Sequence, residues 1–272
     1  MKSLMLSFLL LSQSIAYADS TTVRTEIRIV TLSPHLTELV FALGLGKHVV
    51  GVSDFSDFPA DAESIPRVAS YQGANIPAIL RLKPTHVLAW QGGNKDVDIM
   101  KMKQAGLKVY LSKIESVDTL KNDISEMAAF LGVSQSGESL IAELSQAVSR
   151  IKNRYAGKKQ PTLYYLNNHP LVALGNDKWI NDLLDLCGLS NIFRASIAPY
   201  PQVSVAQILR LEPQLIVSAS NESKAVIEST WREHNSTAYA KVILADADKM
   251  HRFTPRAIIE TARICEKAYT NL

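Results

Sequence analysis

Short apolar runs alternate along the chain with longer segments whose apolar residues recur every three or four positions. The runs at 28–32, 48–53, 85–90 and 108–112 have the length and composition of buried strands. Similar runs return after residue 161, at 162–166, 214–219 and 241–246. Strands that alternate with helical segments in this way predict mostly parallel sheets covered by helices. We therefore expect an α/β fold with two Rossmann-like lobes and a ligand cleft between them.

A repeat supports the division into two lobes. The segment at 71–90, YQGANIPAILRLKPTHVLAW, aligns with the segment at 200–219, YPQVSVAQILRLEPQLIVSA, and both contain ILRL followed by a proline. Asn75 and Ser204 occupy the same position in the two segments, and both are good helix N-caps. Each helix is expected to end before its proline, which leads into a strand. The pattern predicts a duplicated helix–strand unit, one in each lobe.

A long amphipathic segment lies between the two halves. Ser134 or Ser136 can cap a helix that Gly157 ends, and a helix of about 22 residues is roughly 33 Å long. Its apolar residues recur at helical spacing: Leu140, Ile141, Leu144, Val148, Ile151 and Tyr155. We interpret the segment 134–157 as a rigid connector rather than an ordinary packing helix. The expected lobes are then 19–133 and 158–272.

The N-terminal residues have the pattern of a secretory signal peptide. Lys2 precedes a short apolar core, and Ala16–Tyr17–Ala18 is a typical cleavage pattern, which makes residues 1–18 the signal and Asp19 the first mature residue. No later apolar run reaches the ~18 residues of a membrane span. A formal charge of +3 gives no reason to expect nucleic acid as a partner. We predict export to the periplasm.

Export changes the interpretation of the two cysteines. Cys187 and Cys265 form an even pair in an oxidising compartment, which favours a disulfide. Two buried free thiols are the alternative. A metal site is disfavoured because two isolated sulfurs lack the partners that zinc requires.

The ends of the predicted strands carry mostly aromatic side chains. Because the carboxyl ends of parallel strands are where open α/β sheets bind ligands, these residues are expected in the cleft. Aromatic rings there suit a bulky, partly apolar ligand held by a few polar groups. Any one of them could instead pack in a core. The candidates are Phe55, Phe58, Tyr71, Trp90, Tyr200 and the loop 248–252.

The sequence contains no recognisable catalytic constellation. It has no G-x-S-x-G elbow, Walker A loop or G-x-G-x-x-G turn. His35 and His251 fall on predicted cleft-side turns and leave a metal open, although surface histidines are the simpler interpretation. The acidic residues between 54 and 63 are interpreted as solvated turn residues. We expect no enzyme activity, and an exported hydrolase is the remote alternative.

Several motifs resemble one family in order and over nearly the whole mature chain. TLSPHLTELVFALGL, VGVSDFSDFP, VLAWQGGN, CGLSNIF, YPQVS and FTPR are similar to the periplasmic substrate-binding proteins of ABC importers, in particular those that bind cobalamin. The resemblance implies a monomer that captures vitamin B12 between its lobes. It also implies delivery to an inner-membrane ABC transporter, with cobalamin as cargo and no resident cofactor.

The resemblance also implies roles for individual residues. Four aromatic residues would enclose the corrin ring: Phe55, Tyr71, Trp90 and Tyr200. Polar and backbone groups of one loop would bind its peripheral amides: Asp248, Lys249, Met250, His251 and Arg252. No protein ligand to cobalt is expected. The family shares the cysteine pair, which supports a Cys187–Cys265 disulfide.

The chain departs from the family in two places. Leu166 and Val172 stand where pocket phenylalanines are expected, so that wall should be smaller. Pro77 and Ala206 stand where the family carries one transporter-docking glutamate on each lobe. The alternative cargo within the same fold is haem, which requires an iron ligand, or a ferric siderophore, which favours arginines.

Overall fold

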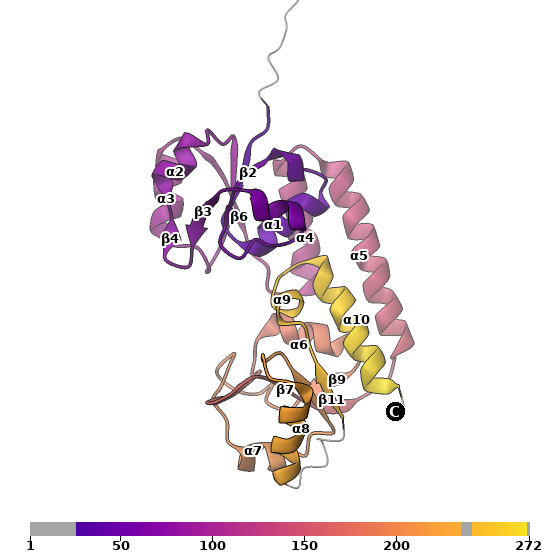
Figure 1. The fold of residues 1–272 in the computed structure, drawn as a ribbon. Helices are drawn as coiled ribbons and strands as arrows, with labels where there is room; N and C mark the ends of the chain where they lie inside the picture. The colour runs from indigo at the N-terminus through magenta and orange to yellow at the C-terminus, as the bar shows by residue number, and fades with distance from the viewer. Residues whose placement is uncertain (1–25, 235–240, 271–272) are drawn as a thin grey trace, which may run out of the picture.

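The computed structural model describes residues 26–234 and 241–270. It confirms the predicted α/β fold: two mostly parallel sheets with helices form two lobes, one above the other in Figure 1. The predicted signal peptide, residues 1–18, and the cleavage at Asp19 lie outside the described residues. In those two ranges, no helix is long and apolar enough to cross a membrane.

The N-terminal lobe is built on a sheet of order β4-β3-β2-β1-β5-β6, in which only the β3–β4 pairing is antiparallel. Its central strand β1 is fully buried, as expected for a strand covered on both faces. The strands are β1 (Ile29–Thr31), β2 (Val49–Ser53), β3 (Arg67–Ser70), β4 (Gly73–Ala74), β5 (His86–Trp90) and β6 (Lys108–Ser112). The helices are α1 (Pro34–Ala42), η1 (Gly46–His48), η2 (Ala60–Ser64), α2 (Ile76–Arg81), α3 (Asp96–Gln104) and α4 (Val117–Phe130).

The C-terminal lobe has a sheet of order β11-β10-β7-β8, with β9 paired to β7. Here β8 is the antiparallel strand. The strands are β7 (Gln160–Asn168), β8 (Leu171–Ala173), β9 (Leu189–Asn191), β10 (Leu215–Ser218) and β11 (Val242–Leu244). The helices are α6 (Lys178–Asp185), α7 (Val205–Arg210), α8 (Lys224–Glu233), α9 (Ala247–Met250) and α10 (Pro255–Tyr269).

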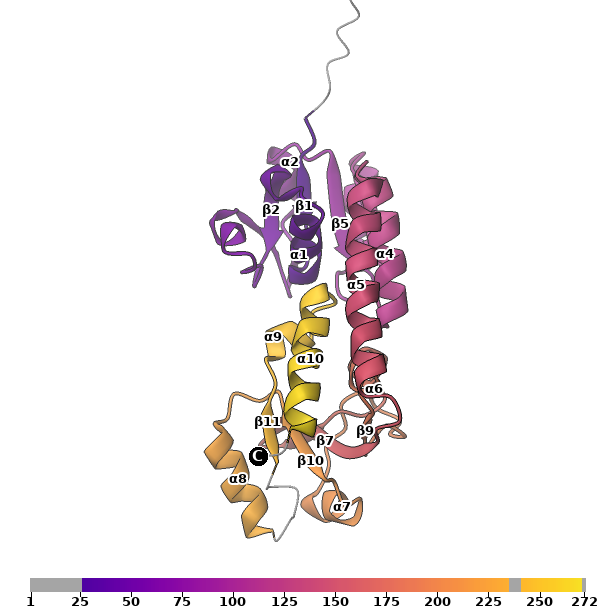
Figure 2. The same cartoon turned by 90° about the vertical axis from the view of Figure 1, so that its right-hand side faces the viewer.

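One long helix, α5 (Ser134–Arg154), runs along the side of both lobes (Figures 1 and 2). It packs against α4 and α10. A single buried apolar cluster includes Leu36 of the N-terminal lobe, Leu144 of α5 and Leu184 of the C-terminal lobe, so the lobes share a continuous core. We call these the upper and the lower lobe, after their places in Figure 1. The predicted serine cap is wrong: the residue before the helix is Val133, and no side chain caps it.

The duplicated unit is present in both lobes. Asn75 caps α2 by accepting a hydrogen bond from the Ala78 amide, and Ser204 forms a capping box with Gln207 at α7, as predicted. Just after the two helices, Lys83 and Glu212 both adopt a left-handed backbone with φ of 47°. Identical backbone geometry at aligned positions supports duplication of the unit beyond the sequence match.

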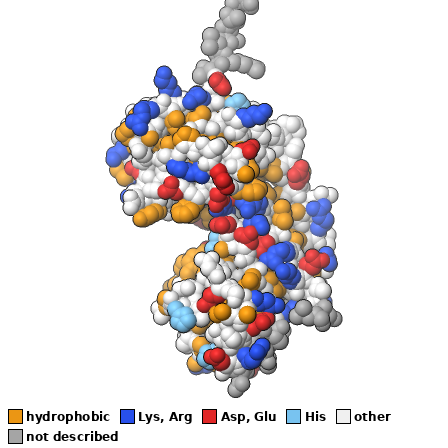
Figure 3. Space-filling model, viewed as in Figure 1, with side chains coloured by type: hydrophobic (Ala, Val, Ile, Leu, Met, Phe, Trp, Pro, Cys, Tyr) orange, Lys and Arg blue, Asp and Glu red, His pale blue; other side chains and the backbone are white. Residues whose placement is uncertain are grey.

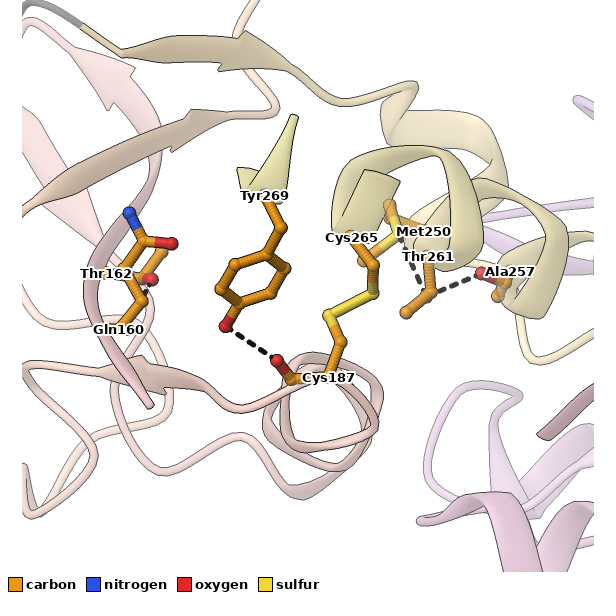
Figure 4. Close-up of a disulfide and its surroundings, with 8 residues drawn as sticks. All are labelled: Gln160, Thr162, Cys187, Met250, Ala257, Thr261, Cys265 and Tyr269. Atoms are coloured by element: carbon orange, nitrogen blue, oxygen red, sulfur yellow. Dashed lines mark hydrogen bonds between the residues drawn. A yellow bond between two sulfur atoms is a disulfide. The ribbon is translucent and has the colours of Figure 1, made fainter. Parts of the chain in front are cut away.

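The predicted disulfide is confirmed. Cys187, just after α6, and Cys265, within α10, are bonded at an S–S distance of 2.05 Å (Figure 4). The Tyr269 hydroxyl donates to the carbonyl of Cys187 at 2.8 Å and adds a second link between the same two segments. The C-terminal helix is therefore fixed to the lower lobe.

Candidate functional site

A cavity of about 210 Å³ lies at the carboxyl edge of the upper sheet. Figure 3 shows the molecule hollowed between the two lobes. Three of the predicted aromatic residues, Phe55, Tyr71 and Trp90, line this one cavity. It is walled by the segments that follow β1, β2, β3 and β5, because parallel strands all end at the same edge.

Phe55 is held out of the core by the residues around it. Ser53 and Ser56 are buried and share a hydrogen bond of 3.1 Å, and Thr37 donates to Ser56 at 3.0 Å. Phe55, between the two serines, has a φ of 61° and is 74% exposed. A left-handed backbone is unfavourable for a bulky residue, and such strain is typical of binding sites.

Gly93 and Asn94, in the turn after β5, hold Trp90 in place. Asn94 accepts from the Trp90 amide at 2.7 Å and donates to the Leu32 carbonyl at 2.8 Å, which joins the ends of β5 and β1. A Cβ on Gly93 would lie 1.8 Å from the indole of Trp90. Glycine is therefore required at 93 so that the ring can lie over the turn.

Tyr71 stands at the lip of the cavity, in the tight turn between β3 and β4. It is 86% exposed, and its hydroxyl accepts from the Gln72 side chain at 3.2 Å. The turn is anchored below by Asp98, which accepts from the Ala74 amide at 2.9 Å. A large aromatic side chain left this open has a surface available for a ligand.

The predicted aromatic residue of the lower lobe, Tyr200, is not among the residues that line this cavity. Tyr200 is exposed, and its hydroxyl donates to Asp177 at 2.9 Å. The other oxygen of Asp177 caps α6 by accepting from the Ile180 amide at 2.9 Å. Burial, followed by the nearby charge of Asp177, raises the pKa of Tyr200. The phenol therefore stays protonated and remains a donor.

The segment 248–252, predicted as a loop, begins as the single helical turn α9, which Asp246 caps. Met250 is fully buried in the lower lobe and offers no surface to a ligand, so its predicted contact is not supported. Lys249 pairs with Asp246 at 2.7 Å, and Asp248 is exposed. His251 is partly buried, and its Nε2 lies 2.9 Å from the Tyr164 hydroxyl.

Arg252 bridges the lobes, and its predicted contact with a ligand stays a prediction. Its guanidinium donates to both carboxylate oxygens of Asp57, at 2.6 and 3.2 Å, and to Glu38 at 3.0 Å. Although burial alone would lower the pKa of Arg252, these bonds raise it, and they hold the pKa of Asp57 below its usual value. Asp57 is exposed, as expected of a turn residue, but it also forms an ion pair that the sequence did not predict.

Arg256 completes this interlobe clamp, which we define as Glu38 and Asp57 of the upper lobe with Arg252 and Arg256 of the lower. Arg256 donates to the same Glu38 oxygen at 2.8 Å. Its guanidinium also lies 3.8 Å from the ring centre of Phe58, which is thereby a clamp contact as well as an exposed aromatic. Sequence spacing alone could not have identified the clamp.

His35 is buried in α1 and is not the surface histidine that was expected. Its ring makes edge contacts with Trp90 and with Phe253 of the lower lobe, both at 5.3 Å between centres. Phe253 also contacts Trp179, so aromatic rings from both lobes meet behind the cavity. Burial, with a smaller contribution from Arg252, lowers the pKa of His35 to about 3.

The four positions at which the sequence departs from the family are not among the residues that line the cavity. Leu166 and Val172 are partly buried in β7 and β8, and Val172 bridges to Gln202, near Tyr200. Pro77 and Ala206 are exposed at matching positions in α2 and α7. Within the described ranges, no three histidine, cysteine or acidic residues are grouped as a metal site would require.

Comparisons with known proteins agree with this architecture. Residues 29–247 match the model of the periplasmic binding protein family. A vitamin B12-binding protein of Vibrio cholerae is 33% identical over 242 residues, which are 88% of this chain and 87% of the relative. One from Photorhabdus laumondii is 32% identical over 247 residues, which are 90% and 89% of the two chains.

Solved structures are similar over the same length. The periplasmic vitamin B12 binding protein BtuF of Vibrio cholerae has a TM-score of 0.77 at 32% identity, covering 88% of this chain and 95% of that one. The haem-binding protein HutB of the same species has a TM-score of 0.81 at 19% identity, covering 90% and 100%. This second likeness concerns the fold alone. The family match spans most of the chain, and the chain therefore belongs to the periplasmic binding protein family.

Proposed function

We propose that this chain captures vitamin B12 in the cleft between its lobes and delivers it to an inner-membrane ABC transporter. The observation that carries the proposal is the aromatic lining at the edge of the upper sheet, where the exposed Phe55 and Tyr71 and the partly buried Trp90 line one cavity. Flat apolar rings suit a macrocycle that must be held without chemistry. The identity to vitamin B12-binding relatives over most of both chains supports the same cargo.

The proposal includes where the protein works and how it is organised. Residues 1–18 would direct export to the periplasm, and the mature chain would act as a monomer with lobes 19–133 and 158–272. The connector 134–157 packs along both lobes, which supports small lobe movements on binding. The chain would bind its cargo without catalysing a reaction. Because Pro77 and Ala206 are not acidic, docking would use other residues.

Haem is the second candidate, and the exposed Tyr71 is the observation that favours it. Its phenol stands open at the lip of the cavity, where an iron ligand could lie. A siderophore would need cationic side chains, yet Arg252 is committed to the clamp. An exported hydrolase is the remote alternative, and turnover of generic ester substrates would support it.

Titration of the mature protein with cyanocobalamin tests the proposal. We expect one-to-one binding below about micromolar by calorimetry, with about tenfold weaker binding in Phe55→Ala and in Tyr71→Ala, as for truncation of central aromatic contacts. Ile259→Ala is the matched control, because Ile259 is an exposed apolar residue of α10 outside the cavity. Absence of cobalamin binding, together with a Soret shift of haemin that Tyr71→Phe abolishes, would replace this function with haem capture.

A further inference from the structure

A groove of about 520 Å³ lies between the connector α5 and the C-terminal helix α10. The two helices pack side by side, as both views of the ribbon show (Figures 1 and 2). The groove shares no lining residue with the aromatic cavity of the upper lobe, so it is a separate site. Six of its lining residues are apolar, three from α5 and its C-cap and three from α10: Ala147, Ile151, Tyr155, Ile258, Ile259 and Ala262.

The apolar surface of the groove is partly open to solvent. Ile151 and Ile258 are buried and form its floor, whereas Ile259 is 69% exposed at its edge. Ala147 and Ala262 have small side chains, which leave the space between the two helices unfilled. A large apolar side chain exposed beside an apolar groove is typical of a surface that binds an apolar group.

The charged residues of the groove are two arginines. Arg150 and Arg154 are four positions apart on α5, so they lie on the same face of the helix, where like charges repel. Within the described ranges, Arg150 has no partner and no acidic side chain lines the groove. Arg154 is held loosely, by Glu266 at 3.8 Å and by the ring of Tyr155 at 5.5 Å. An anion between the two guanidinium groups would relieve their repulsion.

The dimensions of the groove favour an alkyl chain over a partner helix. Its lining residues on α5 span positions 147 to 155, which is roughly 12 Å along a helix axis. Over that length, about 520 Å³ gives a cross-section of roughly 40 Å², about half that of an α-helix with its side chains. An extended alkyl chain can enter such a groove, whereas a helix could only rest on its edge.

We propose that the groove between α5 and α10 binds a fatty acid. The alkyl chain lies along the apolar residues of the groove, and the carboxylate lies between Arg150 and Arg154. A guanidinium presents two parallel N–H groups to a carboxylate, so either arginine can bind the head in a bidentate manner. The bound chain contacts both helices, and α10 is the helix that carries Arg256 of the interlobe clamp. This site does not depend on the identity of the cargo in the cleft.

Calorimetric titration with decanoate, kept below its micelle concentration, tests the proposal. We expect one molecule to bind with a dissociation constant on the order of 100 μM. Octanoate should bind about fivefold more weakly, because its chain leaves two fewer methylene groups in the groove. Decyltrimethylammonium has the same chain length and a cationic head, and it should not bind at these concentrations. Equal binding of the cationic amphiphile, or no binding of decanoate, would overturn the proposal.

Variants of the lining residues locate the site. Arg150→Gln and Ile259→Ala should each weaken decanoate binding about fivefold, the first through loss of a charged contact and the second through loss of apolar area. Both residues are exposed, so neither substitution should prevent folding. Lys152→Gln is the matched control, because Lys152 is an exposed cation of α5 that does not line the groove. Unchanged binding in both groove variants would refute the site.

Cyanocobalamin separates this site from the cleft. A protein saturated with cyanocobalamin should bind decanoate with unchanged affinity. Competition between the two would mean that decanoate binds in the cleft, and would refute the groove. If the wild type binds no cobalamin, the proposed function fails, and the decanoate titration still decides whether the groove binds a fatty acid.

Discussion

His35 is a histidine whose charged form the folded protein excludes. Its ring lies between Trp90 and Phe253, near the guanidinium of Arg252, and its pKa is lowered to about 3 by burial first and by Arg252 second. An unfolded chain binds a proton at this residue near pH 6.5, whereas the folded chain does not. The contribution of His35 to stability is therefore complete above pH 6.5 and is lost as the pH falls toward 3.

This predicts a pH-dependent stability at the residue scale. Between pH 6.5 and 4, the free energy of unfolding should fall by up to about 1.4 kcal/mol per pH unit because of His35 alone. Urea unfolding of wild type and His35→Gln over this range measures the difference in slope. His234→Gln, at an exposed site after α8, is the control and should keep the wild-type slope. Parallel curves for wild type and His35→Gln would contradict the prediction.

The two copies of the duplicated unit provide a prediction at the scale of elements. Lys83 and Glu212, each with φ of 47°, hold a left-handed backbone that costs residues with a Cβ about 1–2 kcal/mol. Glycine avoids this cost but loses more entropy on folding, about 0.5–1 kcal/mol. Lys83→Gly and Glu212→Gly should each stabilise the protein by roughly 0.5–1 kcal/mol in thermal or urea unfolding.

The two substitutions should act alike, because the units are copies. Lys101→Gly, at an exposed position inside α3, is the opposite control and should destabilise by about 1 kcal/mol. Destabilisation by Lys83→Gly or Glu212→Gly would mean that the side chain at that position makes a contact worth more than the backbone strain.

Elements could be predicted from this sequence where local chemistry decides them. The Asn75 and Ser204 caps and the alternation of strands and helices follow from residue types and spacing. The strand ends likewise predicted the aromatic side chains of Phe55 and Trp90, which line the cavity of the upper lobe. The clamp could not be predicted, since Arg252 meets Glu38 and Asp57 across 214 and 195 positions of sequence. The role of Arg252 between the lobes depends on this three-dimensional pairing, which its place in the segment 248–252 does not reveal.

At the scale of the whole molecule, the two lobes are joined both by the interlobe clamp and by the packing of α5. Glu38 is buried and accepts from both Arg252 and Arg256. Removing its charge takes away the carboxylate that pairs with Arg256, and leaves Arg252 with only the more exposed carboxylates of Asp57 and Asp248, which is strongly unfavourable for two largely buried guanidinium groups.

Glu38→Gln should therefore destabilise the protein by about 3 kcal/mol and broaden the distribution of lobe angles. Urea unfolding measures the first effect, and small-angle scattering with hydrogen exchange of α1 and α10 measures the second. Glu143→Gln, on the exposed side of α5, is the matched control. If scattering and exchange are unchanged in Glu38→Gln, α5 alone sets the lobe angle.

The disulfide and one residue of the interlobe clamp lie on the same helix. Cys265 and Arg256 stand on the same helix, α10, roughly 13 Å apart along its axis. The disulfide bonds the C-terminal half of α10 to Cys187 of the lower lobe. At the N-terminal end of α10, Arg256 pairs with Glu38 of the upper lobe. Reduction would break this covalent tie and leave the Tyr269 hydrogen bond and the shared apolar core to hold that end of α10. One helix therefore carries both the covalent crosslink within the lower lobe and an ion pair between the lobes.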